Sequence, residues 1–141
     1  LFVDDHNSSS SAMAEAMGLN LGQSGFVFTS AGLDPKDMVD PAGTFFMKQK
    51  GIDLSRHKPR AVSEVPNLDY YQIIVALTES ARKIFPPPPT KAVCLDWSMK
   101  DPSTVYGTAD EINAAYDETY RFLKAHIQDL VEAILGDADN K

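Results

Sequence analysis

The sequence predicts a single α/β domain in which a four-stranded parallel sheet is flanked by helices in a doubly wound arrangement. Four short, almost uninterrupted apolar runs are typical of strands that are buried on both faces. Helical patterns separate these runs, which favours right-handed crossovers between parallel strands. The chain has 141 residues, 43% of them hydrophobic, which is enough for one domain with one core. It begins at Leu1 rather than at a methionine, which is compatible with an origin in a longer protein.

The predicted strands occupy residues 1–3, 26–29, 73–77 and 92–95. Helices are predicted between them from start and stop signals. The first covers residues 12–19, which are rich in Ala and Met and follow serines that favour helix N-termini. The second begins at Asp40-Pro41 and ends at Gly51, with a capping residue, Pro at the first position and Gly past the end.

Two more helices follow the third predicted strand. A short one at residues 78–84 is stopped by the four prolines at 86–89. The last begins with a capping box, in which Thr108 and Glu111 bond to each other's main chain. Its apolar stripe consists of Ile112, Tyr116, Thr119, Leu123, Ile127, Leu130 and Ile134. This spacing predicts a long amphipathic helix.

Composition and charge exclude several classes of partner. The formal charge of −7 and the pI near 4.8 argue against nucleic acid and anionic membrane surfaces, because both attract basic patches. The chain lacks a run of about 20 apolar residues, and no export signal is visible, so we expect a cytoplasmic protein that contacts neither membrane nor nucleic acid. Cys94 is the only cysteine, which excludes an internal disulfide and a cysteine metal cage. We assign no metal and no cofactor.

The predicted site is the segment that leaves the first strand and enters the first helix. Ligands of parallel α/β sheets bind beyond the carboxyl ends of the strands, near the topological switch point. The residues of this segment are Asp4, Asp5, His6, Asn7, Ser8, Ser9, Ser10 and Ser11. Amide groups at a helix N-terminus favour anions. A small anion or a protein partner is therefore expected at this loop.

Several segments of the chain match, in order, the signature of one family. They are residues 1–16 with the helix entry Met13-Ala14-Glu15, then Thr29-Ser30-Ala31-Gly32, residues 51–58, and residues 97–102 ending in Asp101-Pro102. Together they resemble the low-molecular-weight protein tyrosine phosphatases and the thioredoxin-coupled arsenate reductases of the same fold. The Asp-Pro stretch and the entry to the last helix are more similar to the reductases. The resemblance covers the whole chain, residues 1–141, and implies one domain of the phosphotyrosine protein phosphatase I-like fold.

The resemblance also implies a mechanism. In that family a loop Cys attacks phosphorus or arsenic, an Arg six residues later clamps the oxyanion, and an Asp on a later loop protonates the leaving oxygen. Carried over by position, the nucleophile falls on Asp4, the clamp on Ser10 and the general acid on Asp101. Asn7, Ser11 and Asp101 keep the family's residue type, whereas Asp4 and Ser10 do not.

The reductases also pass a disulfide along two further cysteines. The matching positions here are Thr78 and Phe85, so this relay is absent. Cys94 lies in the fourth predicted strand, where we expect a buried and inert thiol.

A carboxylate at the nucleophile position is unfavourable for oxyanion binding. It accepts hydrogen bonds only, and two unit charges about 4 Å apart repel by about 4 kcal/mol at an effective dielectric constant of about 20. Without the Arg, no positive charge in the loop offsets this repulsion. Tight phosphate or arsenate binding is not expected.

Other interpretations of the acidic residues stay open. Asp4 could be a nucleophile or phospho-acceptor, or Asp4, Asp5 and Asp101 could surround a hard cation. Loop acids are more often solvated or cap helices. Asp101, without a nucleophile to serve, is expected to hold its own loop by hydrogen bonds.

The remaining loop residues also have interpretations that involve no chemistry or ligand. His6 is expected to face solvent, and His57 to have a structural role. The serines at 8–11 are interpreted as flexible filler in which Ser10 or Ser11 caps the helix, although their hydroxyls could also hold a weak anion.

The sequence therefore predicts an inactive homologue of these phosphatases and reductases, retained as a binding or regulatory domain. One alternative is a hydrolase or phosphotransferase of altered chemistry that uses Asp4 or a carboxylate-bound metal. Another is a sensor or interaction module of a larger protein.

Overall fold

The structure, a computed structural model, describes residues 1–139 and contains one four-stranded sheet. The strands are β1 (Phe2–Asp4), β2 (Ser30–Gly32), β3 (Ile73–Ala76) and β4 (Val93–Asp96). They are all parallel and lie in the order β2-β1-β3-β4. The predicted α/β fold with a four-stranded parallel sheet is thus confirmed.

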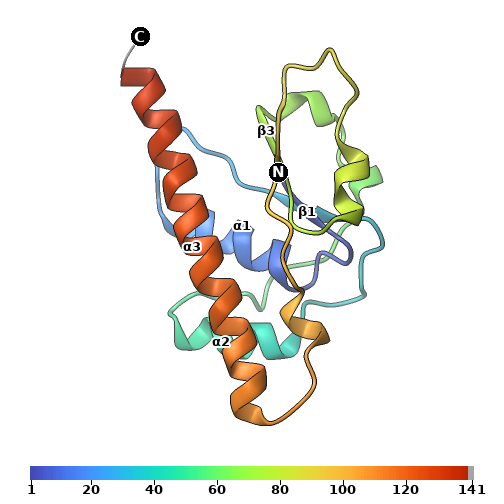
Figure 1. Ribbon diagram of the computed structural model, residues 1–141, viewed down its shortest axis with the longest axis vertical. Coiled ribbons are helices and arrows are strands. Elements are labelled where there is room, and N and C mark those ends of the chain that lie inside the picture. Colours follow the sequence, from blue (N-terminus) through green and yellow to red (C-terminus); the bar gives the residue numbers. More distant parts are fainter. Residues whose placement is uncertain (140–141) are drawn as a thin grey trace.

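Three α-helices and four short 3₁₀ helices surround the sheet. The α-helices are α1 (Ser10–Asn20), α2 (Pro41–Gln49) and α3 (Ala109–Asp139), and the 3₁₀ helices are η1 (Val62–Glu64), η2 (Leu68–Tyr70), η3 (Ser80–Ile84) and η4 (Pro102–Thr104). Figure 1 shows α3 running along one side of the molecule and across α1, which it contacts. The 3₁₀ helices η1 to η3 lie on the other side of the sheet.

The helix boundaries follow the predicted caps. Asp40 caps α2 by accepting a hydrogen bond from the N–H of Ala42, and Pro41 is the first helical residue. At the entry to α3, the hydroxyl of Thr108 accepts from the N–H of Glu111, whose carboxylate accepts from the N–H of Thr108. The capping box is therefore present, and it fixes where α3 begins.

Two predicted elements differ from the structure. The segment predicted as a strand at residues 26–29 precedes β2 rather than forming it, because pairing with β1 begins at Ser30 opposite Phe2. Its apolar character serves packing instead. The Phe28 ring stacks on Phe2 and lies so close to α1 that a Cβ at Gly18 would be 2.5 Å from it. The predicted helix at residues 78–84 is the shorter 3₁₀ helix η3.

The apolar core consists of two clusters, one on each face of the sheet. The larger contains Met13 and Met17 of α1 and Leu123 and Ile127 of α3. The smaller lies under η1 to η3. No helix of the described residues is long and apolar enough to cross a membrane.

β4 departs from the prediction that all four strands are buried on both faces. Val93 is 54% exposed, and Cys94 and Leu95 are only half-buried. The reason is that β4 is the last strand in the sheet and has a neighbouring strand on one side only. The expectation of a buried thiol at Cys94 is therefore wrong.

Candidate functional site

The candidate site is the loop between β1 and α1. β1 is a central strand, with β2 on one side and β3 on the other, so the loop leaves the carboxyl end of the sheet at the topological switch point. The main chain of the loop is held by residues 33–40, since the carbonyls of Asp5, His6 and Ser8 accept hydrogen bonds from this segment. All residues from Asn7 to Ser11 are buried.

The Asp4 carboxylate lies inside its own loop and is only 4% exposed. Its Oδ1 accepts hydrogen bonds from the N–H of Asn7 (2.8 Å) and the hydroxyl of Ser11 (2.8 Å). Its Oδ2 accepts from the hydroxyl of Ser10 (2.8 Å) and the N–H of Ser11 (2.9 Å). Because Ser11 is in the first turn of α1, Asp4 also acts as a long-range cap for this helix. Donors that could surround a bound anion are thus taken by a side chain of the loop itself.

The four serines of the loop are not flexible filler, and that interpretation is wrong. Each is at most 3% exposed, and each donates its hydroxyl to a defined acceptor. Ser10 and Ser11 donate to Asp4, Ser8 donates to the carbonyl of Met38 (3.1 Å), and Ser9 donates to Oδ2 of Asp40 (3.1 Å). Neither Ser10 nor Ser11 caps α1. The N-cap position is Ser9, whose side chain makes no capping bond, and Asp4 supplies the acceptor instead.

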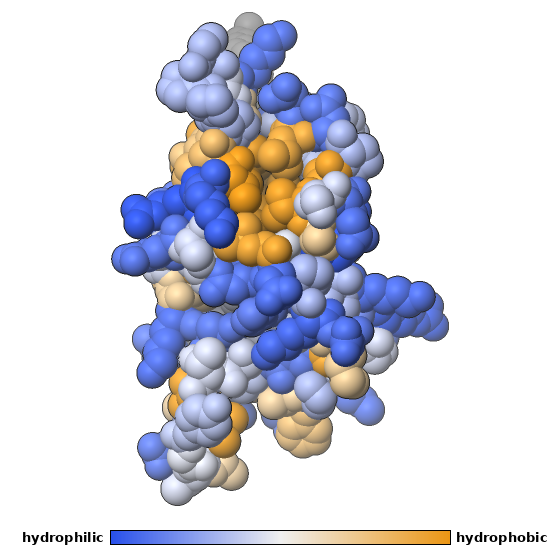
Figure 2. All heavy atoms as spheres, turned by 90° about the vertical axis from the view of Figure 1, so that its right-hand side faces the viewer, coloured by the Kyte–Doolittle hydropathy of each residue, from blue (hydrophilic) through white to orange (hydrophobic). Residues whose placement is uncertain are grey.

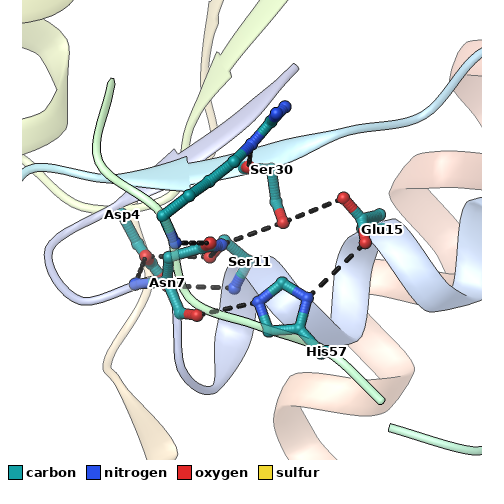
Figure 3. A network of polar contacts seen from close by, with 7 residues as sticks. Asp4, Asn7, Ser11, Glu15, Ser30 and His57 are labelled. Carbon is teal, nitrogen blue, oxygen red and sulfur yellow. Dashed lines mark hydrogen bonds and ion pairs between the residues drawn. The ribbon is translucent and has the colours of Figure 1, made fainter. Parts of the chain in front are cut away.

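Asn7 holds the loop in its shape. Its backbone has φ of 48°, in the left-handed region that Asn tolerates better than most residues. Its Nδ2 donates to the hydroxyls of Ser11 and Ser30 (both 2.9 Å), and its Oδ1 accepts from the N–H of Arg60 (2.9 Å). Figure 3 shows these residues converging on Asn7 from α1, β2 and the segment that precedes η1. Gly32 passes so close that a Cβ there would lie 2.7 Å from the Asn7 nitrogen.

His57 and Glu15 lie next to this network and contact it. His57 Nε2 donates to the main-chain oxygen of Asn7 (2.9 Å), and His57 Nδ1 lies 3.6 Å from Oε2 of Glu15. The hydroxyl of Ser30 donates to the other oxygen of Glu15 (3.1 Å). Burial by itself lowers the pKa of His57, but the Glu15 carboxylate and the Asn7 carbonyl outweigh it, so the pKa of His57 is raised. His57 is therefore structural, as expected.

Sequence reasoning did not identify Glu15, Ser30 and Arg60 as parts of this site. The first two lie within the matched segments Met13-Ala14-Glu15 and Thr29-Ser30-Ala31-Gly32, so those segments contained the signal. The Arg60 contact is made by the main chain, which no residue type indicates.

Comparison with known proteins identifies the family of this chain. The sequence model of the family described as low molecular weight phosphotyrosine protein phosphatase matches residues 1–139. The chain belongs to this family. It is similar to the glutaredoxin arsenate reductase of Synechocystis sp., with 27% identity over 136 residues that cover 96% of this chain and 95% of that protein.

Two solved arsenate reductases have the same fold as this member of the phosphatase family. An arsenate reductase in its oxidized state superimposes with a TM-score of 0.77 and 28% identity, covering 94% of this chain and 95% of that one. The arsenate reductase of Archaeoglobus fulgidus superimposes with a TM-score of 0.70 and 26% identity, covering 90% of this chain and 97% of that one. The predicted resemblance is thus confirmed at the level of family and fold.

The expected relay positions and the other polar residues of the loop make defined contacts. Thr78, which we expect at one relay position, donates to Oδ1 of Asp5 (3.1 Å), and Ser80 donates to the same oxygen. Phe85, which we expect at the other relay position, is half-buried and packs against the smaller core cluster. His6 contacts the carbonyl of Asp34 through Nδ1 (2.8 Å) at the surface.

Asp101, which the sequence analysis places at the family's general-acid position, holds its own loop. Its Oδ1 accepts hydrogen bonds from the N–H (2.9 Å) and the hydroxyl (2.7 Å) of Ser103, so Asp101 is the N-cap of η4. The nearby hydroxyl of Tyr116 donates to Asp40. Burial, the bond to Asp40 and the charges of Asp40 and Asp101 raise the pKa of Tyr116, so its hydroxyl remains a donor well beyond neutral pH.

A metal centre is not assembled from these acids. Within the part of the chain that the structure describes, no group of three His, Cys, Asp or Glu side chains is arranged to hold a metal ion. Asp4 directs its carboxylate into the loop, Asp5 towards Thr78 and Asp101 towards Ser103.

Proposed function

We propose that this chain is a non-catalytic member of the low molecular weight phosphatase family and serves as a binding or regulatory domain. The observation that carries the proposal is the Asp4 carboxylate, which is buried in the loop and accepts four hydrogen bonds from it. A thiolate at this position would attack the substrate. A carboxylate that is already bonded on both oxygens is a weak nucleophile, because each bond stabilises the charge that would attack.

Electrostatics at the loop also disfavour an oxyanion. A phosphate or arsenate entering the loop would meet the charge of Asp4 without an Arg to balance it, since Ser10 occupies the clamp position. Ser10 instead donates to Asp4, so even the replacement side chain serves the internal carboxylate. The absence of cysteine at Thr78 and Phe85 removes the reductase relay independently of the loop.

The alternative of altered chemistry has less support. A hydrolase using Asp4 needs an accessible carboxylate, and this one is 4% exposed. A carboxylate-bound metal needs the acids to converge, and those of the described residues do not. A role within a larger protein is compatible with the proposal, since a folded but inactive domain can bind a partner through its surface.

The test is an assay of the purified protein with aryl phosphates over a range of pH and divalent metals, and with arsenate in the presence of glutathione and glutaredoxin. An active family member is the positive control. We expect rates equal to those of the buffer and unchanged by Asp4→Ala. Turnover that Asp4→Ala abolishes would overturn the proposal and favour Asp4 as a nucleophile.

A further inference from the structure

Four of the nine prolines of the chain are consecutive, Pro86 to Pro89, in the connection from η3 to β4. One proline is enough to end a helix, because its ring clashes with the preceding turn and it has no N–H to donate. Four in succession are more than the end of η3 requires. In Figure 1 this yellow connection projects beyond the sheet before it returns to β4. The proposed function gives this motif no role.

The main chain of the connection begins in the polyproline II conformation. Phe85 has φ of −58° and ψ of 129°, near the values of about −75° and 145° that define this helix. Proline locks φ at about −65°, which keeps Pro86 and Pro87 in the same range. The peptide bonds are trans up to Pro88, and the bond between Pro88 and Pro89 is cis. We call residues 85–88 the proline segment. Its prolines are rigid before any partner binds, which lowers the entropy that binding costs.

The proline segment is accessible to a partner. Pro87 and Pro88 are exposed, and Pro86 is half-buried. Among the described residues, no N–H or hydroxyl donates a hydrogen bond to the carbonyls of these three prolines. A polyproline II helix has no internal hydrogen bonds, so the carbonyls are left to solvent. They are free to accept hydrogen bonds from the indole or phenol groups of an aromatic groove.

Both ends of the connection are held by the core. Ile84 and Phe85 before the prolines, and Ala92 after them, are half-buried and pack against the smaller core cluster. Figure 2, which views the molecule from the side of η1 to η3, shows apolar side chains gathered in one patch with hydrophilic residues around it. Contiguous patches of this kind mark interaction sites in soluble proteins. A partner that binds the prolines next to η3 can therefore gain contacts with this side of the molecule.

The charges near the proline segment are balanced. Arg82 pairs with Asp96 (3.4 Å), and Asp5 accepts a hydrogen bond from Ser80 of η3. The three bases around the segment are matched by three acids, namely Arg82, Lys83 and Lys91 against Glu79, Asp96 and Asp5. Charge therefore does not select a partner here, and the uncharged prolines do.

We propose that the proline segment is a docking site for a proline-recognition domain of another protein, one whose groove is lined by aromatic side chains. Such grooves recognise proline-rich segments because the segment is already extended and presents rigid, apolar rings. The inference goes beyond the proposed function, because it requires no property of the 4–11 loop.

The test is a titration of the full chain into isotope-labelled SH3, WW and EVH1 domains, which all bind proline-rich segments in aromatic grooves. The chemical shifts of N–H groups in each groove report binding. We expect at least one of these domains to bind, and a proline-rich peptide that occupies its groove to displace the chain.

The double variant Pro87→Ala/Pro88→Ala should bind about tenfold more weakly, because alanine has neither the ring nor the fixed φ of proline. Pro66→Ala is the matched control. Pro66 is also exposed but lies outside the proline segment, so this variant should bind like the wild type. Circular dichroism and urea unfolding show whether each variant is folded.

The absence of chemical shift changes in all three domains, up to millimolar concentration of the wild-type chain, would overturn the proposal, and this result requires no variant. So would binding that the folded double variant retains in full, or binding that Pro66→Ala weakens to the same extent.

Discussion

The hydroxyl of Ser10 donates a hydrogen bond of 2.8 Å to Oδ2 of Asp4, so the residues that we expect at the family's clamp and nucleophile positions contact each other. In an active loop these positions would act on a bound oxyanion from two sides. Here one side chain supplies the negative charge and the other a donor for it. Ser10 and Asp4 are therefore a matched donor and acceptor, and their hydrogen bond lies within the folded loop.

The first prediction concerns stability at Asp4. Asp4→Ala should lower the free energy of unfolding by about 2–4 kcal/mol, because it leaves buried donors of Asn7, Ser10 and Ser11 without an acceptor. Urea unfolding measures the change. Asp129→Ala removes an exposed acid and should change the free energy of unfolding by no more than about 0.5 kcal/mol. Equal effects of the two variants would contradict the structural role of Asp4.

The second prediction is chemical rescue at the same position. Asp4→Gly removes the carboxylate and leaves space lined by its former donors, which formate can fill. We expect formate to raise the melting temperature of Asp4→Gly more than chloride does at the same ionic strength. The wild type serves as the control, since its own carboxylate occupies the site. A formate effect of the same size in the wild type would indicate non-specific stabilisation.

The third prediction concerns a thiol introduced at residue 4. In Asp4→Cys, the N–H groups of Asn7 and Ser11 and the amino end of α1 should stabilise a thiolate. Its pKa should then lie below about 8.5, the usual value for cysteine. A Cys94→Ala background makes this thiol unique, and its ultraviolet absorbance or alkylation rate against pH gives the pKa. An unshifted pKa would show that the amides do not point at this position.

The fourth prediction separates two roles of Asn7. Asn7→Ala loses the side-chain bonds and also strains a backbone with φ of 48°, whereas Asn7→Gly loses the bonds alone. Urea unfolding should show both variants destabilised, Asn7→Ala by about 1 kcal/mol more than Asn7→Gly. The reverse order would mean that the left-handed conformation is not kept in solution.

The fifth prediction is a pH dependence of stability that comes from His57. Because its pKa is raised in the folded state, His57 binds its proton more tightly there than in the unfolded chain. The resulting stabilisation is complete below the unfolded value of about 6.5 and is lost as the pH rises through the higher folded value. Urea unfolding at acidic and alkaline pH should show that His57→Gln costs more stability at the acidic end.

Glu15→Gln should reduce the same pH dependence, because the Glu15 carboxylate is what outweighs the burial of His57. Glu118→Gln, which changes an exposed acid on α3, provides the control. If Glu15→Gln left the pH dependence unchanged, a group other than His57 would be its source.

The order of strands and helices could be predicted from the sequence because its signals are local. Asp40-Pro41 and the Thr108–Glu111 box fix helix starts through bonds that span two or three residues. Local signals were misleading where packing decides. Phe26 and Phe28 form an apolar run like that of a strand, yet their rings stack against each other and Phe28 stacks on Phe2, while strand pairing starts only at Ser30.

The sequence alone also determined that the loop contains Asp4 and Ser10 and neither cysteine nor arginine, since this is a matter of residue identity. The contacts that the loop makes were decided by the tertiary structure. The contacts of Asn7 with Ser30, His57 and Arg60 span 23 to 53 residues, and the bond from Thr78 to Asp5 spans 73. No periodicity encodes such pairs, because they exist only once the parallel strands bring these segments to one edge of the sheet. In the same way, the sequence predicted that the acid at position 4 would repel anions. Only the folded loop determined that the donors of the loop point at the carboxylate of this acid.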